Sequence, residues 1–285
     1  MKFGASMFFT DYSMTPQELA VAMEERGFDS LWAPEHSHIP VSRKTPFPLA
    51  PELPRKYYDV MDPFVSLAAA AVVTTRLRLG TGVCLVVQRD PIQTAKLVAS
   101  IDQISQGRFL FGIGNGWNQD EIENHGTNFA SRHKVARERV EAMKVIWTQD
   151  RAEYHGEFVT FDPIMAWPKP VQKPYPPILV GGAFPYSARR AIRYGNGWMP
   201  QVTQGATTPL TELIPRFRQM AAEAGRDPAS LMIGVGATQP DHTDTFEKCQ
   251  ALGVDWVQTS LDSAGRDVIL PQLDRWAEVI RRFSD

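Results

Sequence analysis

The sequence predicts an α/β protein with the (β/α)₈ architecture of a TIM barrel. Apolar, strand-like runs alternate with amphipathic helical segments, and eight such strand–helix units follow one another within 285 residues. Their spacing is nearly even and the length suits one barrel-sized domain, so residues 1–285 are interpreted as a single domain. An open, doubly wound sheet is the competing arrangement. In either fold, ligands gather at the carboxyl ends of the strands.

The first unit carries clear local signals. Residues 3–9 form a short apolar run that fits a buried strand. Thr15 then has the position of a helix N-cap, with Pro16 at the first helical position and Glu18 completing a capping box. Residues 28–33 form the second strand. The whole unit spans about 35 residues, which is the size of one βαβ crossover.

The same pattern repeats through the rest of the chain. Asp62 and Asp90, each followed by proline, are predicted to cap the second and third helices. The later strands are predicted at residues 77–85, 108–114, 177–181, 196–200, 231–236 and 254–259. The later helices begin near residues 62, 90, 131, 185, 210 and 243, and the last one carries Leu273, Trp276, Ala277 and Ile280 on one face.

Two long segments interrupt this rhythm. Residues 37–61 form a proline-rich loop after the second strand, and residues 151–176, before the fifth strand, hold a hairpin-like stretch and a proline-rich return. Long loops inside a compact domain are often functional. In a barrel, the first of these loops lies on the face that carries active sites.

Composition argues against several classes of partner. The net charge is −2 and the charges of both signs are interspersed, so neither nucleic acid nor an anionic membrane is expected as a partner. No apolar run is long enough to cross a bilayer, and the first residues lack a signal-peptide pattern. Cys84 and Cys249 lie in apolar or helical contexts and are interpreted as reduced thiols. The expected location is therefore the cytoplasm.

The second strand runs directly into Glu35, His36 and His38. A His-x-His pair at a barrel strand end can bind a metal, which would indicate a metal-dependent hydrolase. Of the remaining histidines only His242 follows a strand in a suitable place, so the ligand set looks incomplete and no metal is expected. A general acid or base needs one histidine alone. A histidine that only hydrogen-bonds the loop is the competing interpretation.

Glycine-rich strand ends form a second kind of signal. Residues 112–116 lack the G-x-G-x-x-G spacing, so they are a weak dinucleotide motif but would let a flat ligand approach the backbone closely. Gly181 and Gly182 precede a helix, where free N–H groups could bind phosphate or simply form a tight turn. Gly82, within the third strand, indicates a bulge or a close backbone approach.

Taken together, these segments resemble the bacterial luciferase-like family of flavin and deazaflavin oxidoreductases. They occur in the family's order as far as about Trp198, and beyond it the likeness is mainly architectural. The matching segments are residues 27–32 with Glu35 and His36, residues 80–82, 102–109 and 111–114, Gly126, Ser131 with Arg132, and Gly181 with Gly182.

The resemblance implies a TIM barrel with a flavin-type ring at the strand carboxyl ends. His36 corresponds to the family's active-site histidine. Gly82 and Val83 correspond to a bulge that often contains a non-proline cis peptide beneath the ring. Asn115 stands where the sugar-phosphate dehydrogenase branch has an acid, which argues against that activity. The implied cofactor-binding residues are Gly82, Val83, Asn115, Arg132, Gly181, Gly182 and Ala183.

Residues 168–174, which lead into the Gly181–Gly182 turn, look like the branch that uses the deazaflavin coenzyme F420, with FMN as the rival cofactor. The expected function is hydride transfer between coenzyme F420 and a small organic substrate, with His36 as acid or base. An FMN monooxygenase that uses O₂ and reduced flavin from a partner enzyme is the alternative within the class.

Two functions outside this class stay open, namely the metal-dependent hydrolase and a non-catalytic cofactor-binding relative. The resemblance also implies a homodimer. Trp32 and Trp117 are candidates for the pocket wall, although core packing is the simpler role for both. Four basic residues of the first long loop are hypothesised to meet the anionic tail of coenzyme F420. They are Arg43, Lys44, Arg55 and Lys56.

Overall fold

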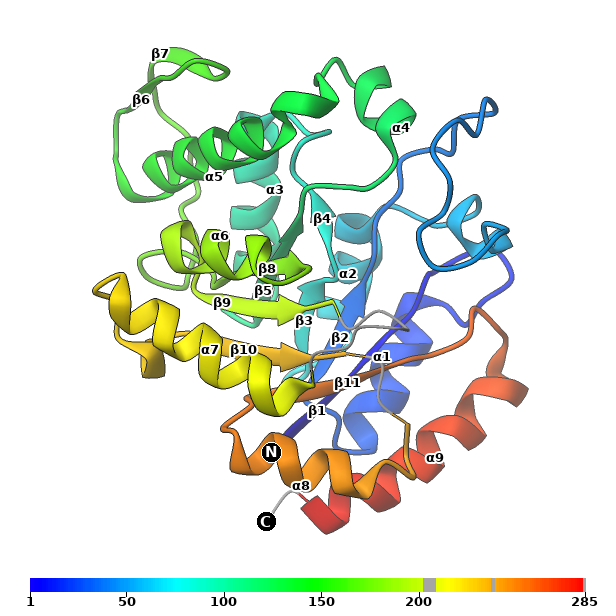
Figure 1. Cartoon of the computed structure of the whole chain (residues 1–285). Coiled ribbons are helices and arrows are strands. Elements are labelled where there is room, and N and C mark those ends of the chain that lie inside the picture. Colours follow the sequence, from blue (N-terminus) through cyan, green and yellow to red (C-terminus); the bar gives the residue numbers. More distant parts are fainter. Residues whose placement is uncertain (202–208, 237–238, 284–285) are drawn as a thin grey trace.

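The computed structural model describes residues 1–201, 209–236 and 239–283. In these ranges, eight parallel strands form a barrel with helices around it (Figure 1). The barrel strands are β1 (Lys2–Ser6), β2 (Ser30–Ala33), β3 (Arg78–Thr81), β5 (Phe109–Gly114), β8 (Ile178–Gly182), β9 (Gly197–Pro200), β10 (Met232–Val235) and β11 (Trp256–Ser260). The surrounding helices are α1 (Pro16–Glu25), α2 (Pro63–Ala71), α3 (Pro91–Ile104), α5 (Arg132–Thr148), α6 (Tyr186–Tyr194), α7 (Leu210–Glu223), α8 (Thr243–Ala251) and α9 (Arg266–Phe283).

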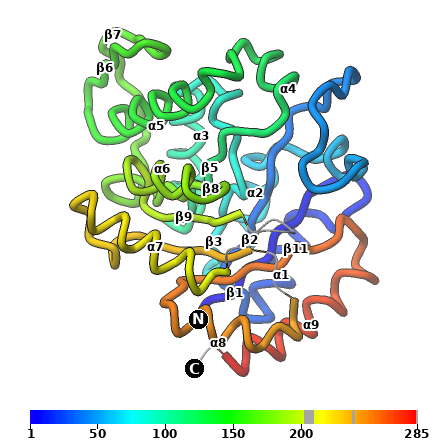
Figure 2. The backbone as a smooth tube through the Cα atoms, in the orientation of Figure 1, coloured from blue at the N-terminus to red at the C-terminus, as the bar shows by residue number. Residues whose placement is uncertain are grey.

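Pairing between the first and last strands closes the barrel. β1 pairs in parallel with β11, with Lys2 opposite Trp256, and each barrel strand also pairs with the next along the chain. The amino group of Met1 donates to the carbonyl of Phe283, so the two ends of the described chain lie side by side (Figure 2). The predicted TIM barrel is confirmed, and the open sheet is excluded. None of the described helices is both long and apolar enough to cross a membrane.

The helix starts follow the predicted capping. Thr15 and Glu18 form a reciprocal capping box at α1. The Asp62 carboxylate accepts from the N–H of Phe64 at 2.8 Å, and the Asp90 carboxylate accepts from the N–H of Gln93 at 2.8 Å. Each cap satisfies N–H groups that the first helical turn leaves without a partner. The predicted apolar face of α9 is also buried in the core.

Two tryptophans fill the inside of the barrel. Trp32 and Trp256 are fully buried and stack with their ring centroids 5.4 Å apart. A Cβ atom added at Gly80 would lie 2.3 Å from the Trp32 ring, and one at Gly234 would lie 2.0 Å from the Trp256 ring. Glycine at these positions therefore makes room for the large rings. Trp32 therefore packs in the core, which is the simpler of the two roles considered for it from the sequence.

The third predicted strand is divided. β3 ends at Thr81 and β4 (Cys84–Leu85) continues after a cis peptide between Gly82 and Val83. Both parts pair with β5, so the chain leaves the sheet and returns to it. The cis peptide lies where the resemblance placed it, at the carboxyl end of the strand.

Both insertions are present. The loop after β2 contains a short 3₁₀ helix, η1 (Arg55–Tyr57), and rises beside the short helix α4 (Gln119–Asn124) at the upper right of Figure 1. The second insertion contains the antiparallel hairpin of β6 (Ala152–His155) and β7 (Thr160–Ile164), which extends from the upper left. The remaining 3₁₀ helices are η2 (Phe129–Ser131) and η3 (Pro228–Ser230).

Candidate functional site

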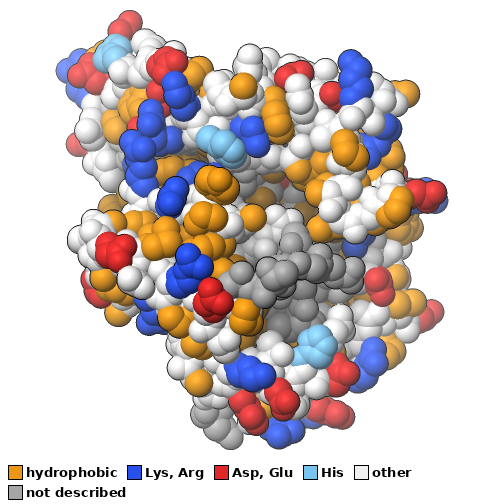
Figure 3. Space-filling model, in the orientation of Figure 1, with side chains coloured by type: hydrophobic (Ala, Val, Ile, Leu, Met, Phe, Trp, Pro, Cys, Tyr) orange, Lys and Arg blue, Asp and Glu red, His pale blue; other side chains and the backbone are white. Residues whose placement is uncertain are grey.

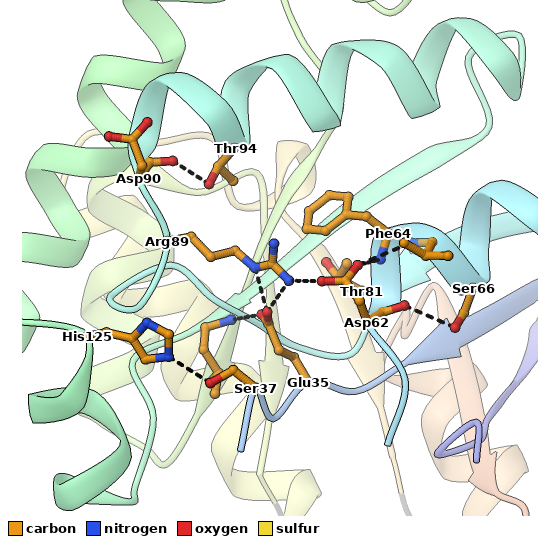
Figure 4. A network of polar contacts seen from close by, with 12 residues as sticks. Glu35, Ser37, Asp62, Phe64, Ser66, Thr81, Arg89, Asp90, Thr94 and His125 are labelled. Atoms are coloured by element: carbon orange, nitrogen blue, oxygen red, sulfur yellow. Dashed lines mark hydrogen bonds and ion pairs between the residues drawn. The ribbon is translucent and has the colours of Figure 1, made fainter. Parts of the chain in front are cut away.

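Glu35 fixes the end of β2 to its neighbours. Its buried carboxylate accepts from the N–H of Leu85 at 2.6 Å and pairs with Arg89. Arg89 also pairs with Asp62, the N-cap of α2, and so lies between the two carboxylates (Figure 4). A buried charge needs such partners to be tolerated. Glu35 therefore has a structural role. It fixes the backbone that carries His36, the next residue.

His36 is held by a carboxylate that comes from α4. Its side chain is 6% exposed, and its Nδ1 lies 2.8 Å from Oε2 of Glu121, whose side chain is 0% exposed. The other oxygen of Glu121 accepts from the N–H of Ser37 at 3.1 Å. The two contacts fix both the ring and the backbone that carries it. Nε2 is then the ring nitrogen left for a ligand.

Aromatic side chains surround the His36 ring. The ring centroids of Tyr57 and Trp117 lie 5.3 and 5.8 Å from that of His36. Phe47 packs on both of them, at 5.0 Å from Tyr57 and 5.5 Å from Trp117, and Phe8 packs on Tyr57 at 4.6 Å. These rings come from the ends of β1, β2 and β5. They form an apolar wall that includes Trp117, for which core packing was the simpler expectation.

The glycine turns meet around Val83. A Cβ atom added at Gly114 would lie 2.5 Å from Val83 Cγ2, and one at Gly181 would lie 3.0 Å from Val83 Cγ1. The bulge after β3 is therefore packed between the ends of β5 and β8. Gly114 and Gly181 thus leave the space that the Val83 side chain fills, and Gly82, Val83, Gly114 and Gly181 form one packed group, called the glycine cluster below.

Asn115 directly follows Gly114 and contacts α5. Its buried side-chain amide donates to Nδ1 of His133 at 2.7 Å. Burial and, to a smaller extent, the nearby positive charges of Arg132 and Arg190 lower the pKa of His133 to about 4. The imidazole is therefore neutral near pH 7, in agreement with its role as the acceptor.

Arg132, at the start of α5, and Arg190, midway along α6, form a positive site. Burial lowers the pKa of both, and the proximity of Arg190 lowers that of Arg132 further. The Nε atoms of both arginines are buried and have no partner among the described residues. Gly182, at φ +129°, lies beside them, and a Cβ atom there would be 3.6 Å from Nη2 of Arg190. The geometry suits an anion such as phosphate.

Some of the other buried polar atoms without a described hydrogen-bond partner lie at the same end of the barrel, whereas those of Arg137, Tyr194 and Arg218 belong to α5, α6 and α7. The atoms at this end are in loops that follow strands, and a polar ligand or water is the usual partner of such atoms. They belong to Thr10, Arg43, Gln88 and Asn118. Figure 3 shows Lys and Arg side chains beside a histidine on the upper left of this face and again at its upper right edge, with a recess between them.

The matched segment 102–109 has a structural role. The buried carboxylate of Asp102 accepts from the N–H and the side-chain amide of Gln172, at 2.9 and 2.7 Å. Arg108 donates to the carbonyls of Leu77 and Ala71, at 2.6 and 2.9 Å. These contacts join α3 and β5 to the second insertion and to α2. The segment therefore supports the strand end without being part of the site.

His38 does not form a metal site with His36. It is hydrogen-bonded to Ser37 Oγ at 2.9 Å and to Asn124 at 2.9 Å, and His125 bonds the same hydroxyl at 2.7 Å (Figure 4). In the part of the chain that the structure describes, no group of three His, Cys, Asp or Glu residues could hold a metal ion. The metal-dependent hydrolase therefore gains no support.

The basic residues of the first loop are largely engaged. Arg55 pairs with Asp59 at 2.8 Å, and Lys56 lies 5.1 Å from the centre of the Phe8 ring. Arg43 lies 6.0 Å from the centre of the Trp117 ring. These basic residues belong to the loop after β2. Arg132 and Arg190, called the arginine pair below, belong to α5 and α6. Contact with a cofactor tail remains a hypothesis for the basic residues of the loop.

Comparison with known proteins gives the family. The luciferase-like monooxygenase family matches residues 14–254. The chain belongs to this family. A protein of Mycobacterium tuberculosis with no assigned function is 43% identical over 285 residues, 97% of this chain and 98% of its own. The F420-dependent hydroxymycolic acid dehydrogenase of the same organism is 29% identical over 215 residues, 74% of this chain and 55% of its own.

The fold of this luciferase-like oxidoreductase is shared with solved structures. The monooxygenase RslO1 from Streptomyces bottropensis superposes with a TM-score of 0.78 at 22% identity, over 100% of both chains. At that identity the likeness concerns the fold alone. Three polar residues of the site were not foreseen from the sequence, namely Glu121, His133 and Arg190. A basic residue in a helix that follows a double-glycine turn is the signal that could have indicated Arg190.

Proposed function

We propose that this luciferase-like oxidoreductase transfers a hydride between coenzyme F420 and a small organic substrate. The observation that carries the proposal is one end of the barrel that combines three features. A buried imidazole is held by a carboxylate, the cis-peptide bulge at Gly82 and Val83 is packed between glycines of two other strands, and two arginines each have a buried Nε atom without a partner among the described residues. When bound, the deazaflavin would supply the carbon that gives or takes the hydride.

The residues present fit such a cofactor. Val83, seated between Gly114 and Gly181, would support the planar ring at this end of the barrel. Arg132 and Arg190, with the N–H groups after Gly182, suit its phosphate. Gly82, Asn115 and Ala183 stay in the proposal as further cofactor-binding residues.

The protein's own contribution is proton transfer and exclusion of water. Nε2 of His36 would accept a proton from the substrate when the hydride moves to the cofactor. It would return the proton when the hydride moves back to the substrate. Tyr57, Phe47 and Trp117 cover the imidazole and keep water from it. The substrate then needs a group that can lose or gain a proton, such as an alcohol or a carbonyl.

Coenzyme F420 is favoured because a relative at 29% identity is named as an F420-dependent dehydrogenase. The alternative is an FMN-dependent monooxygenase that uses O₂ and a partner enzyme to reduce its flavin. The fold that this chain shares with the monooxygenase RslO1 is compatible with that alternative. The glycine cluster and the pair of Arg132 and Arg190 would accept either ring and either phosphate.

Direct titration separates the two cofactors. The purified protein is titrated with coenzyme F420 and, separately, with FMN while tryptophan fluorescence is followed, since Trp117 lies in the site. We expect saturable quenching by coenzyme F420 at concentrations at which FMN has no effect. Tight binding of FMN alone would replace the proposal with the monooxygenase. Binding of neither would overturn both.

We also propose that the protein acts in the cytoplasm as a homodimer. The two cysteines, Cys84 and Cys249, are unpaired and buried, as suits a reducing compartment. The homodimer is implied by the family resemblance. Light scattering of the purified protein measures its mass in solution, and a mass of one chain would contradict the dimer.

A further inference from the structure

Helix α4 is joined to the loop after β2 by a series of polar contacts. The carboxylate of Asp120 accepts from Ser42 Oγ at 2.6 Å and from the N–H of Lys44 at 3.3 Å. The N–H of Gln119 donates to Thr45 Oγ1 at 3.1 Å. These contacts lie on the exposed side of the helix, where water can replace a lost bond at little cost. They hold the loop in place without touching His36.

Glu121, the next residue of α4, faces inward. Its side chain is fully buried, and its described hydrogen bonds go to Nδ1 of His36 and to the N–H of Ser37. No lysine or arginine in the described ranges forms an ion pair with it. Burial of a carboxylate is unfavourable unless its oxygens are hydrogen-bonded. Such a group is therefore unusual as mere packing and indicates a role for the imidazole it holds.

We propose that Glu121 is the positioning residue of His36. Its carboxylate can only accept, so the neutral imidazole must carry its proton on Nδ1. The lone pair of Nε2 is then free on the far side of the ring, where a substrate proton can be taken. This role in catalysis rests on the proposed function, whereas the choice of tautomer follows from the contact itself.

The same carboxylate also balances charge during proton transfer. When Nε2 takes a proton, the ring becomes an imidazolium with Nδ1–H still bonded to Glu121. The positive charge then has a negative partner in a site that the aromatic wall shields from water. Histidines that act as bases are commonly oriented by a third group in this way.

Two neighbouring acids allow a matched test. Glu121→Gln keeps the size of the side chain and removes its charge, because an amide can donate as well as accept. Asp120→Asn makes the same exchange one residue earlier, at a carboxylate that holds the loop but not the imidazole. Both variants are compared with the unchanged protein, free of cofactor, after thermal unfolding has shown that they fold.

The first measurement is nitrogen NMR of the protein labelled in its 6 histidines, at about pH 8, where an unperturbed imidazole is neutral. His36→Gln assigns the signal. We expect the Nδ1–H tautomer of His36 in the unchanged protein and in Asp120→Asn, and its loss or mixture with the other tautomer in Glu121→Gln. An unchanged tautomer in Glu121→Gln, or an equal change in Asp120→Asn, would overturn the proposal. If Glu121→Gln does not fold, Glu121→Asp shortens the acid, and the same loss is expected.

A second measurement concerns catalysis. Once coenzyme F420 binding has been established, Glu121→Gln should lower kcat by about 10²-fold or more while the dissociation constant of the cofactor stays unchanged. Asp120→Asn should keep its kcat. The NMR result does not depend on any cofactor, so failure of the F420 titration would leave the tautomer assignment standing.

Discussion

At the scale of single residues, we expect replacement of His36 to slow the chemical step without weakening cofactor binding. His36 contacts Glu121 and aromatic rings, and it is not part of the glycine cluster or the arginine pair. His36→Ala is therefore expected to lower turnover by about 10²–10⁴-fold, the usual contribution of one positioned acid or base. Cofactor binding should be retained. Both are measured on the same preparation, by fluorescence titration and by turnover of the first alcohol or carbonyl substrate found with coenzyme F420.

His38→Ala is the matched control for this change. His38 lies two residues further along the same loop and bonds Ser37 and Asn124 instead of Glu121. Its replacement should leave turnover within a few-fold of the unchanged protein. Equal losses in the two variants would show that the loop, and not the imidazole of His36, determines the rate.

Sequence reasoning identified the catalytic candidate and not its partner. His36 could be picked out because it directly follows a strand, and local pattern shows where strands end. Glu121 lies 85 residues away in a short helix. No periodicity or spacing relates two such positions, because their contact depends on how α4 lies over the barrel. His133 was missed for the same reason, since its role comes from two arginines on different helices.

At the scale of elements, the arginine pair should recognise the phosphate of the cofactor. Arg190 comes from α6, and its Nε atom is buried without a described partner. Arg190→Met is expected to weaken binding of the phosphate-bearing cofactor by about 10–100-fold, which corresponds to the 1.5–3 kcal/mol typical of a hydrogen bond to a charged group. Binding of an analogue that lacks the phosphate should change little. Fluorescence titration with the two ligands gives both values.

Arg189→Met provides the control, because Arg189 is exposed on the same helix. It removes the same net charge from the surface without touching the buried site. If both variants weaken both ligands equally, the effect comes from general electrostatics, and α6 has no specific phosphate site.

The elements themselves were well predicted where local chemistry determines them. The capping residues Thr15, Asp62 and Asp90 each begin a helix as expected, because a side chain that accepts from the first turn acts within three residues. The division of the third strand was not visible from apolar pattern. It depends on how Val83 packs between Gly114 and Gly181, which belong to later strands.

At the scale of the whole molecule, the barrel follows from eight repeats of one local unit. Its closure needs only that β1 pair with β11, and the buried tryptophans opposite Gly80 and Gly234 fill the interior. The order of units along the chain also places every strand end on one face. For this reason the sequence could predict that the site lies on that face. It could not show which of the loops contribute residues to the site.

Proton binding at this face is linked to the stability of the whole fold. The pKa of His133 in the folded protein is about 4, lowered first by burial and then by Arg132 and Arg190, against about 6.5 for a histidine in an unfolded chain. Between these values the unfolded chain binds a proton that the folded protein does not. The contribution of His133 to the free energy of unfolding therefore decreases as the pH falls from about 6.5 towards 4.

Replacing His133 should remove this decrease in the free energy of unfolding at low pH. We expect the unfolding temperature of the cofactor-free protein to fall more between pH 7.5 and pH 5 than that of His133→Asn, as measured by calorimetry in the same buffers. A phosphate-bearing cofactor should narrow the difference, because its negative charge offsets Arg132 and Arg190 and lets the imidazole take up its proton in the folded state. The same exchange at His155, on the β6–β7 hairpin, tests whether the loss of any histidine has this effect. Equal pH dependence of the unchanged protein and His133→Asn would mean that the pKa of His133 is not lowered in the folded protein.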